Sequence, residues 1–230
     1  MIDCDGISVS WLGYATLRIT GDETTVYLDP GRYGVLEGYD GGDGDIVCVT
    51  HDHHYDTDGI RTVAATDAEL VLFEGINTHR IERSVERPAD LPYETRTVDT
   101  ESDIAVGEAI IRTTAAYNDP EESRVRETGE PYHPEGLGWG FHVTLAGTSV
   151  YYPGDTDVLD GHDRLDVDVF CPPIGGTFTM DRHEAADLAV ALDPDVVLPV
   201  HYDAFPAIEA DGEAFAADLE KRGVSVELDR

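Results

Sequence analysis

The feature that most constrains this chain is a short apolar strand that runs directly into a cluster of metal-binding side chains. Residues 46–50 read Ile-Val-Cys-Val-Thr, a run typical of a strand buried on both faces. Residues 51–58 follow with imidazole and carboxylate groups at most positions. His51 and His53 lie two apart in a segment expected to be extended, so they project to one side and can share an ion. The alternative is a solvated polar loop, but three histidines within four residues, of nine in the chain, favour a metal site.

Two other predicted strands end in the same way. Residues 148–152 are followed by Pro-Gly-Asp, which places Asp155 after a tight turn, and residues 196–200 are followed by His201. Each residue alone has an ordinary explanation, since Asp155 suits a turn and His201 suits a core position. Their shared place at the ends of apolar strands adds both to the candidate site.

The order of predicted elements indicates an α+β fold in one domain over residues 1–230. Strands come in two blocks, each followed by helices, without strict alternation, which favours a sandwich with helices outside over a doubly wound sheet. Short helices are expected at 59–66 and 75–85. The clearest helix is 181–192, where Asp181 can cap the first turn. A last strand is expected at 224–228.

Charge narrows the classes of function. The chain carries 15 basic and 48 acidic side chains, a formal net charge of −33. Such self-repulsion is screened at molar salt, so we predict a protein adapted to a high-salt cytoplasm; an acidic partner-binding face is the alternative. Binding to nucleic acid or to a membrane surface is not expected, because phosphate contacts need clustered basic residues. No apolar run approaches the length of a membrane span, and no signal peptide is evident.

These motifs together resemble the metallo-β-lactamase superfamily. The resemblance rests on the His-x-His after a strand, on Gly-Asp-Thr at 154–156 and on Pro-x-His at 199–201, and extends over about residues 7–206. Residues 11–16 and 173–180 are similar to a lactonase-like branch related to ascorbate-phosphate lactonase and N-acyl-phosphatidylethanolamine phospholipase. The resemblance implies a four-layer αββα sandwich with a metal site, usually binuclear, on one edge.

The resemblance also implies ligands, with one departure from the family motif. His51, His53, Asp155 and His201 match the family's ligand positions. The Asp-His pair that ends the His-x-His-x-Asp-His motif is altered. If His54 is an insertion, which we prefer, Asp56 restores the aspartate; it remains open whether His54 or Asp58 replaces the missing histidine.

A second departure concerns the family's middle histidine. This ligand is missing near residues 117–118, and His133 is the candidate replacement, although an ordinary loop histidine is nearly as good an interpretation. The loop 118–138 also contains Arg124 and Arg126. They could face an anionic group, but a solvated, salt-bridged loop is the better interpretation.

The expected activity is that of a metal-dependent hydrolase. Zinc or manganese, as one or two ions, suits the mixed imidazole and carboxylate ligands, and a metal-activated water would attack a small ester, lactone or phosphoester. Asp56 is the candidate ligand or general base. The alternative is a non-catalytic metal-binding or interaction protein that has lost its second metal site. A nuclease is disfavoured because the sequence has no basic patch.

Overall fold

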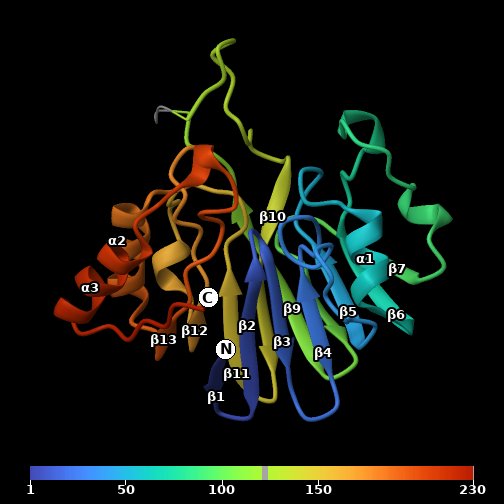
Figure 1. Ribbon diagram of the computed structural model, residues 1–230, viewed down its shortest axis with the longest axis horizontal. Helices are drawn as coiled ribbons and strands as arrows, with labels where there is room; N and C mark the ends of the chain where they lie inside the picture. Colours follow the sequence, from blue (N-terminus) through green and yellow to red (C-terminus); the bar gives the residue numbers. More distant parts are fainter. Residues whose placement is uncertain (121–123, 230) are drawn as a thin grey trace.

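The computed structural model describes residues 1–120 and 124–229 and contains two β-sheets packed face to face (Figure 1). The seven-stranded sheet follows chain order: β1 (Ile2–Cys4), β2 (Ile7–Gly13), β3 (Thr16–Thr20), β4 (Thr25–Leu28), β5 (Gly44–Val49), β6 (Ala64–Phe73) and β7 (Glu94–Val98). The six-stranded sheet has the order β13 (Val196–Val197), β12 (Val169–Phe170), β11 (Thr148–Tyr152), β10 (Gly138–Leu145), β9 (Ala109–Ala116) and β8 (Asp103–Val106). The predicted loop 118–138 includes residues 121–123, which lie outside the described residues.

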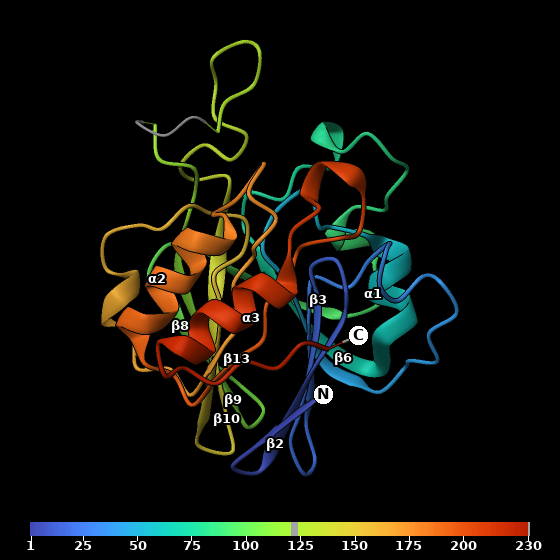
Figure 2. The ribbon, with the colours of Figure 1, turned by 60° about the vertical axis from the view of Figure 1, so that its left-hand side comes forward.

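The sheets enclose one apolar core, and helices cover their outer faces. On the inner side, residues such as Val26, Phe141 and Val150 from both sheets belong to a single buried cluster. Strands β5 and β11 are buried almost throughout, because helices cover the faces that point away from that core. Helix α1 (Thr57–Val63) lies against the first sheet, and α2 (Arg182–Leu192) and α3 (Gly212–Lys221) lie against the second (Figures 1 and 2). The predicted αββα sandwich is confirmed.

Helix α2 forms as its sequence predicts. The Asp181 side chain accepts hydrogen bonds from the N–H groups of His183 and Glu184, while the Glu184 side chain accepts from the N–H of Asp181, so the capping box is complete. Its apolar face packs on α3 and the second sheet in one buried cluster. In the described part of the chain, no helix is long and apolar enough to cross a membrane.

Three local predictions differ from the structure. The helix expected at 75–85 is reduced to the 3-10 turn η1 (Thr78–Arg80), because the Asn77 side chain caps this turn and the N–H of Asn77 donates to the Asp52 side chain at 2.8 Å. The helix expected at 59–66 begins and ends earlier, as α1, because Asp56 caps it and β6 begins at Ala64. The strand expected at 224–228 pairs only through the bridge of Val226 with Val197. The remaining short turns are η2 (Pro88–Asp90), η3 (His162–Arg164) and η4 (Pro206–Ile208).

The topology brings three strand ends to one edge of the sandwich. Strand β5 lies parallel to β4 and β6, and β11, β12 and β13 lie parallel to one another. The segments that follow β5, β11 and β13 carry His51, Asp155 and His201, and these side chains meet. The connection from β6 to β7 and the one from β9 to β10 rise above this edge (Figure 1).

Candidate metal centre

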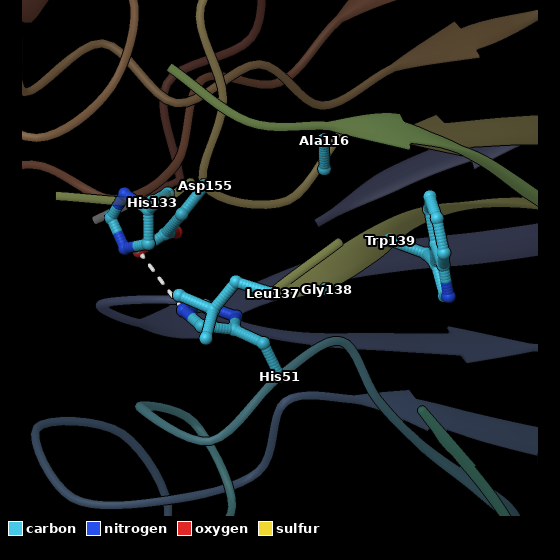
Figure 3. A pocket seen from close by; sticks show the side chains of 7 residues that line it. All are labelled: His51, Ala116, His133, Leu137, Gly138, Trp139 and Asp155. Carbon is cyan, nitrogen blue, oxygen red and sulfur yellow. Dashed lines mark ion pairs between the residues drawn. The ribbon is translucent and has the colours of Figure 1, made fainter. Parts of the chain in front are cut away.

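Four side chains from three separate segments meet at this edge and form what we call the first histidine group: His51, His53, His133 and Asp155. One ligand atom from each lies within 4.8 Å of the others. Nδ1 of His53 is 3.0 Å from Nε2 of His133, which is 3.3 Å from Oδ2 of Asp155. Nε2 of His51 is 3.7 Å from the same oxygen. Figure 3 shows His51 facing His133 and Asp155 beside a cavity of about 10 Å³.

A second histidine group consists of His54, Asp155 and His201, whose ligand atoms also lie within 4.8 Å of one another. Oδ1 of Asp155 is 3.1 Å from Nε2 of His54 and 3.3 Å from Nε2 of His201. All three side chains are buried. Because Oδ2 of Asp155 faces the first group and Oδ1 faces the second, this one carboxylate bridges the two groups.

The charges of Asp155, His51 and His53 are those that metal ligands require. Burial alone would raise the pKa of Asp155, but His201 and His54 outweigh it and hold the pKa well below its usual range, so the carboxylate is ionised. Burial lowers the pKa of His51. Burial, followed by the neighbouring His133, lowers the pKa of His53 to about 4. These two imidazoles are therefore neutral at neutral pH and can offer a nitrogen lone pair to a cation.

Two buried nitrogen atoms without a hydrogen-bond partner indicate whether a metal ion fits this centre. Nε2 of His51 and Nε2 of His201 make no hydrogen bond to any described residue, although both are enclosed. An unpaired buried polar atom costs about 1–3 kcal/mol. A divalent cation held by each group would satisfy the unpaired nitrogen of that group, and imidazole with carboxylate is a donor set that such cations accept. The residues present fit a metal.

Hydrogen bonds behind the rings fix which nitrogen faces the centre. The Thr50 hydroxyl donates to Oδ2 of Asp29 at 2.7 Å, so it accepts from Nδ1 of His51 at 2.9 Å. Nδ1 of His133 lies 3.1 Å from the carbonyl oxygen of Phe178 and therefore donates to it. In both rings Nε2 is left as the acceptor that points into the centre, an arrangement common around protein-bound metals.

Asn118 holds His133 in place. The N–H of His133 donates to Oδ1 of Asn118 at 2.8 Å, and the N–H of Asn118 donates to the carbonyl of His133 at 2.7 Å. The Asn118 amide also donates to the carbonyl of Phe178 at 2.9 Å. Asn118 is buried and lies where the family's middle histidine is missing, so it positions His133, the predicted replacement for that ligand.

The structure brings His51, His53, His133, Asp155 and His201 together, but for His51 and His53 the reason differs from the one predicted. The segment is a turn, not an extended strand end: the N–H of His54 donates to the carbonyl of His51 at 3.2 Å. This turn directs His54 to the other oxygen of Asp155. Sequence reasoning left His54 open as a ligand; the turn-forming run His-Asp-His-His was the available signal.

Asp56 is not in either group of described residues. Its Oδ1 accepts from the N–H groups of Asp58 and Gly59 at the start of α1, and its Oδ2 lies 3.5 Å from Nε of Arg83. A carboxylate at this position satisfies free N–H groups of the helix, which explains why the chain has Asp here. Asp58 is exposed and also lies outside both groups. The ligand role expected for Asp56 is therefore not supported by its position, and its role as general base stays a prediction.

Comparison with known proteins agrees with this geometry. A model of the beta-lactamase superfamily domain matches residues 8–201. A UPF0173 metal-dependent hydrolase of Methanopyrus kandleri is 31% identical, and the match covers 96% of this chain and 94% of the relative. Another, from Methanoculleus marisnigri, is 32% identical over 93% of this chain and 88% of the relative. The chain belongs to the UPF0173 metal-dependent hydrolase family.

Solved structures support the fold of this UPF0173 family member. A protein of Parabacteroides distasonis superposes with a TM-score of 0.76 at 22% identity, over 97% of this chain and 92% of the other. The metallo-beta-lactamase fold protein YhfI of Bacillus subtilis gives a TM-score of 0.69 at 13% identity, over 98% and 96%. At these identities the likeness shows the metallo-β-lactamase fold alone. The narrower relationship to the lactonase and phospholipase branch stays a prediction.

The metal centre opens into a cleft of about 480 Å³. His53, His133 and Asp155 line its floor, whereas the imidazoles of the second group lie behind Tyr14, whose ring centre is 4.5 Å from that of His201. Burial, followed by Asp155, raises the pKa of Tyr14, which therefore keeps its phenolic proton. A volume of this size suits a small molecule.

The two arginines of the loop 118–138 have different surroundings. Arg124 forms ion pairs with Asp157, at 2.9 Å, and with Glu184, which confirms the salt-bridged interpretation for this residue. Arg126 has no ion pair with a described residue and lines the cleft.

Proposed function

We propose that this UPF0173 family member is a hydrolase that holds zinc or manganese, as one or two ions, in the two histidine groups, and cleaves a small ester, lactone or phosphoester. The observation that carries the proposal is the shared carboxylate: each oxygen of buried Asp155 faces different imidazoles, beneath a cleft large enough for a small molecule. A bound divalent cation would supply an activated water and would polarise the substrate's carbonyl or phosphoryl oxygen.

The chain's own residues support this chemistry in three ways. Thr50 and the Phe178 carbonyl hold the protons of His51 and His133 on Nδ1, away from the centre. Asp155 brings a negative charge that offsets cationic charge in a buried place. Tyr14, which keeps its proton, lines the cleft and can donate a hydrogen bond to a substrate oxygen.

Metal content tests the proposal. The protein would be purified without a histidine tag in high salt, supplied with zinc or manganese, desalted and analysed by elemental mass spectrometry. His51→Ala and His201→Ala each remove one ring from a different group, and His79→Ala, an exposed histidine outside both groups, is the matched control. We expect near-stoichiometric metal in the wild type and the control, the loss of one ion in His201→Ala, and a partial loss in His51→Ala, whose group keeps three donors.

Two outcomes would count against the hydrolase. Metal-free protein after loading would leave an interaction protein on this fold. Stoichiometric metal without hydrolysis of aryl ester, lactone or phosphodiester probes would favour a metal-binding protein that is not catalytic, the alternative suggested by the altered motif at 54–58.

A further inference from the structure

The arginines of the cleft divide into two kinds. Arg80 and Arg83 face buried carboxylates, at 2.6 Å from Asp52 and 3.5 Å from Asp56, and Arg83 also donates to the carbonyl of Tyr55 at 2.6 Å. These two arginines hold the turn 51–56 and the segment after β6 in place. The other two cleft arginines, Arg32 and Arg126, are exposed and form no ion pair with a described residue, although the Arg126 guanidinium donates to the carbonyl of Tyr132 at 3.3 Å.

An arginine without an acidic partner is unusual in this chain, which has 48 acidic and 15 basic side chains. Over residues 1–120 and 124–229, only Arg32, Arg126 and Arg182 form no ion pair with an acidic side chain. Two of these three arginines line the cleft above the metal centre. Their charges are therefore available to a ligand.

Arg32 and Arg126 each lie over an aromatic wall, a cluster of aromatic side chains that adjoins one histidine group. Cζ of Arg126 is 5.3 Å from the ring centre of Tyr132, whose ring meets Phe178 edge-on at 4.8 Å. Tyr132 precedes His133 in the chain, so this wall adjoins the first histidine group. A tight turn holds Arg126 in place, because its N–H donates to the carbonyl of Glu130 at 2.7 Å.

A second aromatic wall of the same cleft repeats this arrangement. Cζ of Arg32 is 5.8 Å from the ring centre of Tyr33, and Tyr33 packs against Tyr14 and Phe205 at 6.0 and 5.8 Å. Tyr14 in turn contacts the rings of His54 and His201, which belong to the second histidine group. A guanidinium beside aromatic rings suits a ligand with an anionic group and a flat apolar part.

We propose that Arg32 and Arg126 bind the oxyanion of the substrate, a small molecule that carries a carboxylate or phosphate group next to an aromatic or apolar part. This inference rests on the proposed function for the identity of the ligand as a substrate. The forked guanidinium matches either oxyanion. In a chain of net charge −33, two such arginines lining one cleft also offset the repulsion that an anion would otherwise meet on approach.

Calorimetric titration with three probes tests the proposal: phenylphosphonate, benzoate and neutral benzyl alcohol, at fixed ionic strength. Each probe is titrated into metal-loaded protein and into protein stripped by a chelator, with metal content measured on the same samples. The variants are Arg32→Gln and Arg126→Gln. Arg182→Gln is the matched control, because Arg182 also has no ion pair with a described residue but does not line the cleft.

We expect at least one of the two anions to bind both the loaded and the stripped protein, and each cleft variant to weaken that binding about tenfold. Arg182→Gln should leave it unchanged, and neither cleft variant should alter the weak binding of benzyl alcohol. The anion that binds more tightly identifies the oxyanion as phosphate-like or carboxylate-like. Circular dichroism of each variant verifies that it is folded.

Two results would overturn the proposal: no binding of either anion, or anion binding that needs the metal and is the same in both cleft variants. The second would assign anion recognition to the cation alone. Arginine-dependent binding to a protein that takes up no metal would instead remove the proposed hydrolase and keep the anion site. Failure of one proposal is thereby distinguishable from failure of the other.

Discussion

The two histidine groups share Asp155 but differ in donors and in access. The first has three imidazoles and lines the floor of the cleft, with His53 exposed. The second has two imidazoles, all its members are buried, and Tyr14 lies between it and the cleft. Four donors can complete a tetrahedral zinc site, whereas three leave a position for water or substrate. The second group therefore offers one donor fewer than the first, and we expect it to bind a metal ion more weakly.

The largest effect is expected where the groups are joined. Asp155→Asn keeps the shape of the side chain but removes the charge that both groups share, so metal content should fall at both sites and hydrolysis should fall by about a thousandfold. Elemental mass spectrometry and single-turnover rates measure the two effects. Asp168→Asn, an acid outside both groups that accepts hydrogen bonds from Ser149, is the control. Retention of two ions by Asp155→Asn would show that the groups are independent.

A pair of variants tests the inequality between the groups. His201→Ala leaves two donors in the second group, too few to hold an ion against dilution, so one equivalent of metal should be lost. His51→Ala leaves three donors in the first group, as many as the intact second group has, so that ion should be retained with lower affinity. Competition with a chromophoric chelator measures each affinity. The expected difference in metal affinity between the two groups would be wrong if His201→Ala keeps both ions or if His51→Ala loses the first ion completely.

Asn118→Ala should act on the first group alone. Without the side-chain bonds to the N–H of His133 and the carbonyl of Phe178, the ring of His133 is less well positioned, and metal affinity should fall about tenfold. The affinity of the second group should not change. Asn77→Ala, which removes an exposed cap of η1, controls for the loss of an amide. Equal weakening of both groups would point to a general loosening of the fold.

The fold and most of the centre were predictable because they depend on local patterns. Buried strands such as 46–50 can be recognised from their apolar composition. The capping pair Asp181 and Glu184 marks the start of α2. Asp155 and His201 could be assigned because each follows such a strand. The positions of these residues after strands, and their resemblance to a family motif, required no knowledge of long-range contacts.

The role of the segment 51–58 depended on one turn that the sequence did not determine. His54 faces Asp155 because its N–H donates to the carbonyl of His51 and closes the turn. Asp56 does not face Asp155 because its carboxylate caps the N-terminus of α1. Both arrangements satisfy local preferences. The pairing of Arg124, and the lack of a described ion pair at Arg126 two residues later, likewise depends on Asp157 and Glu184, which lie far away in the sequence.

The smallest effect is expected at Asp56, and it decides between a structural and a chemical role. Asn caps a helix about as well as Asp, so Asp56→Asn should change the free energy of unfolding by less than about 0.5 kcal/mol, while Asp56→Ala should lower it by about 1 kcal/mol. Denaturant unfolding measures both values. If Asp56 only caps α1, metal content and hydrolysis in Asp56→Asn should match the wild type. A hundredfold loss of rate with stability and metal intact would instead make Asp56 the general base, in the pocket that it lines together with His54 of the second group.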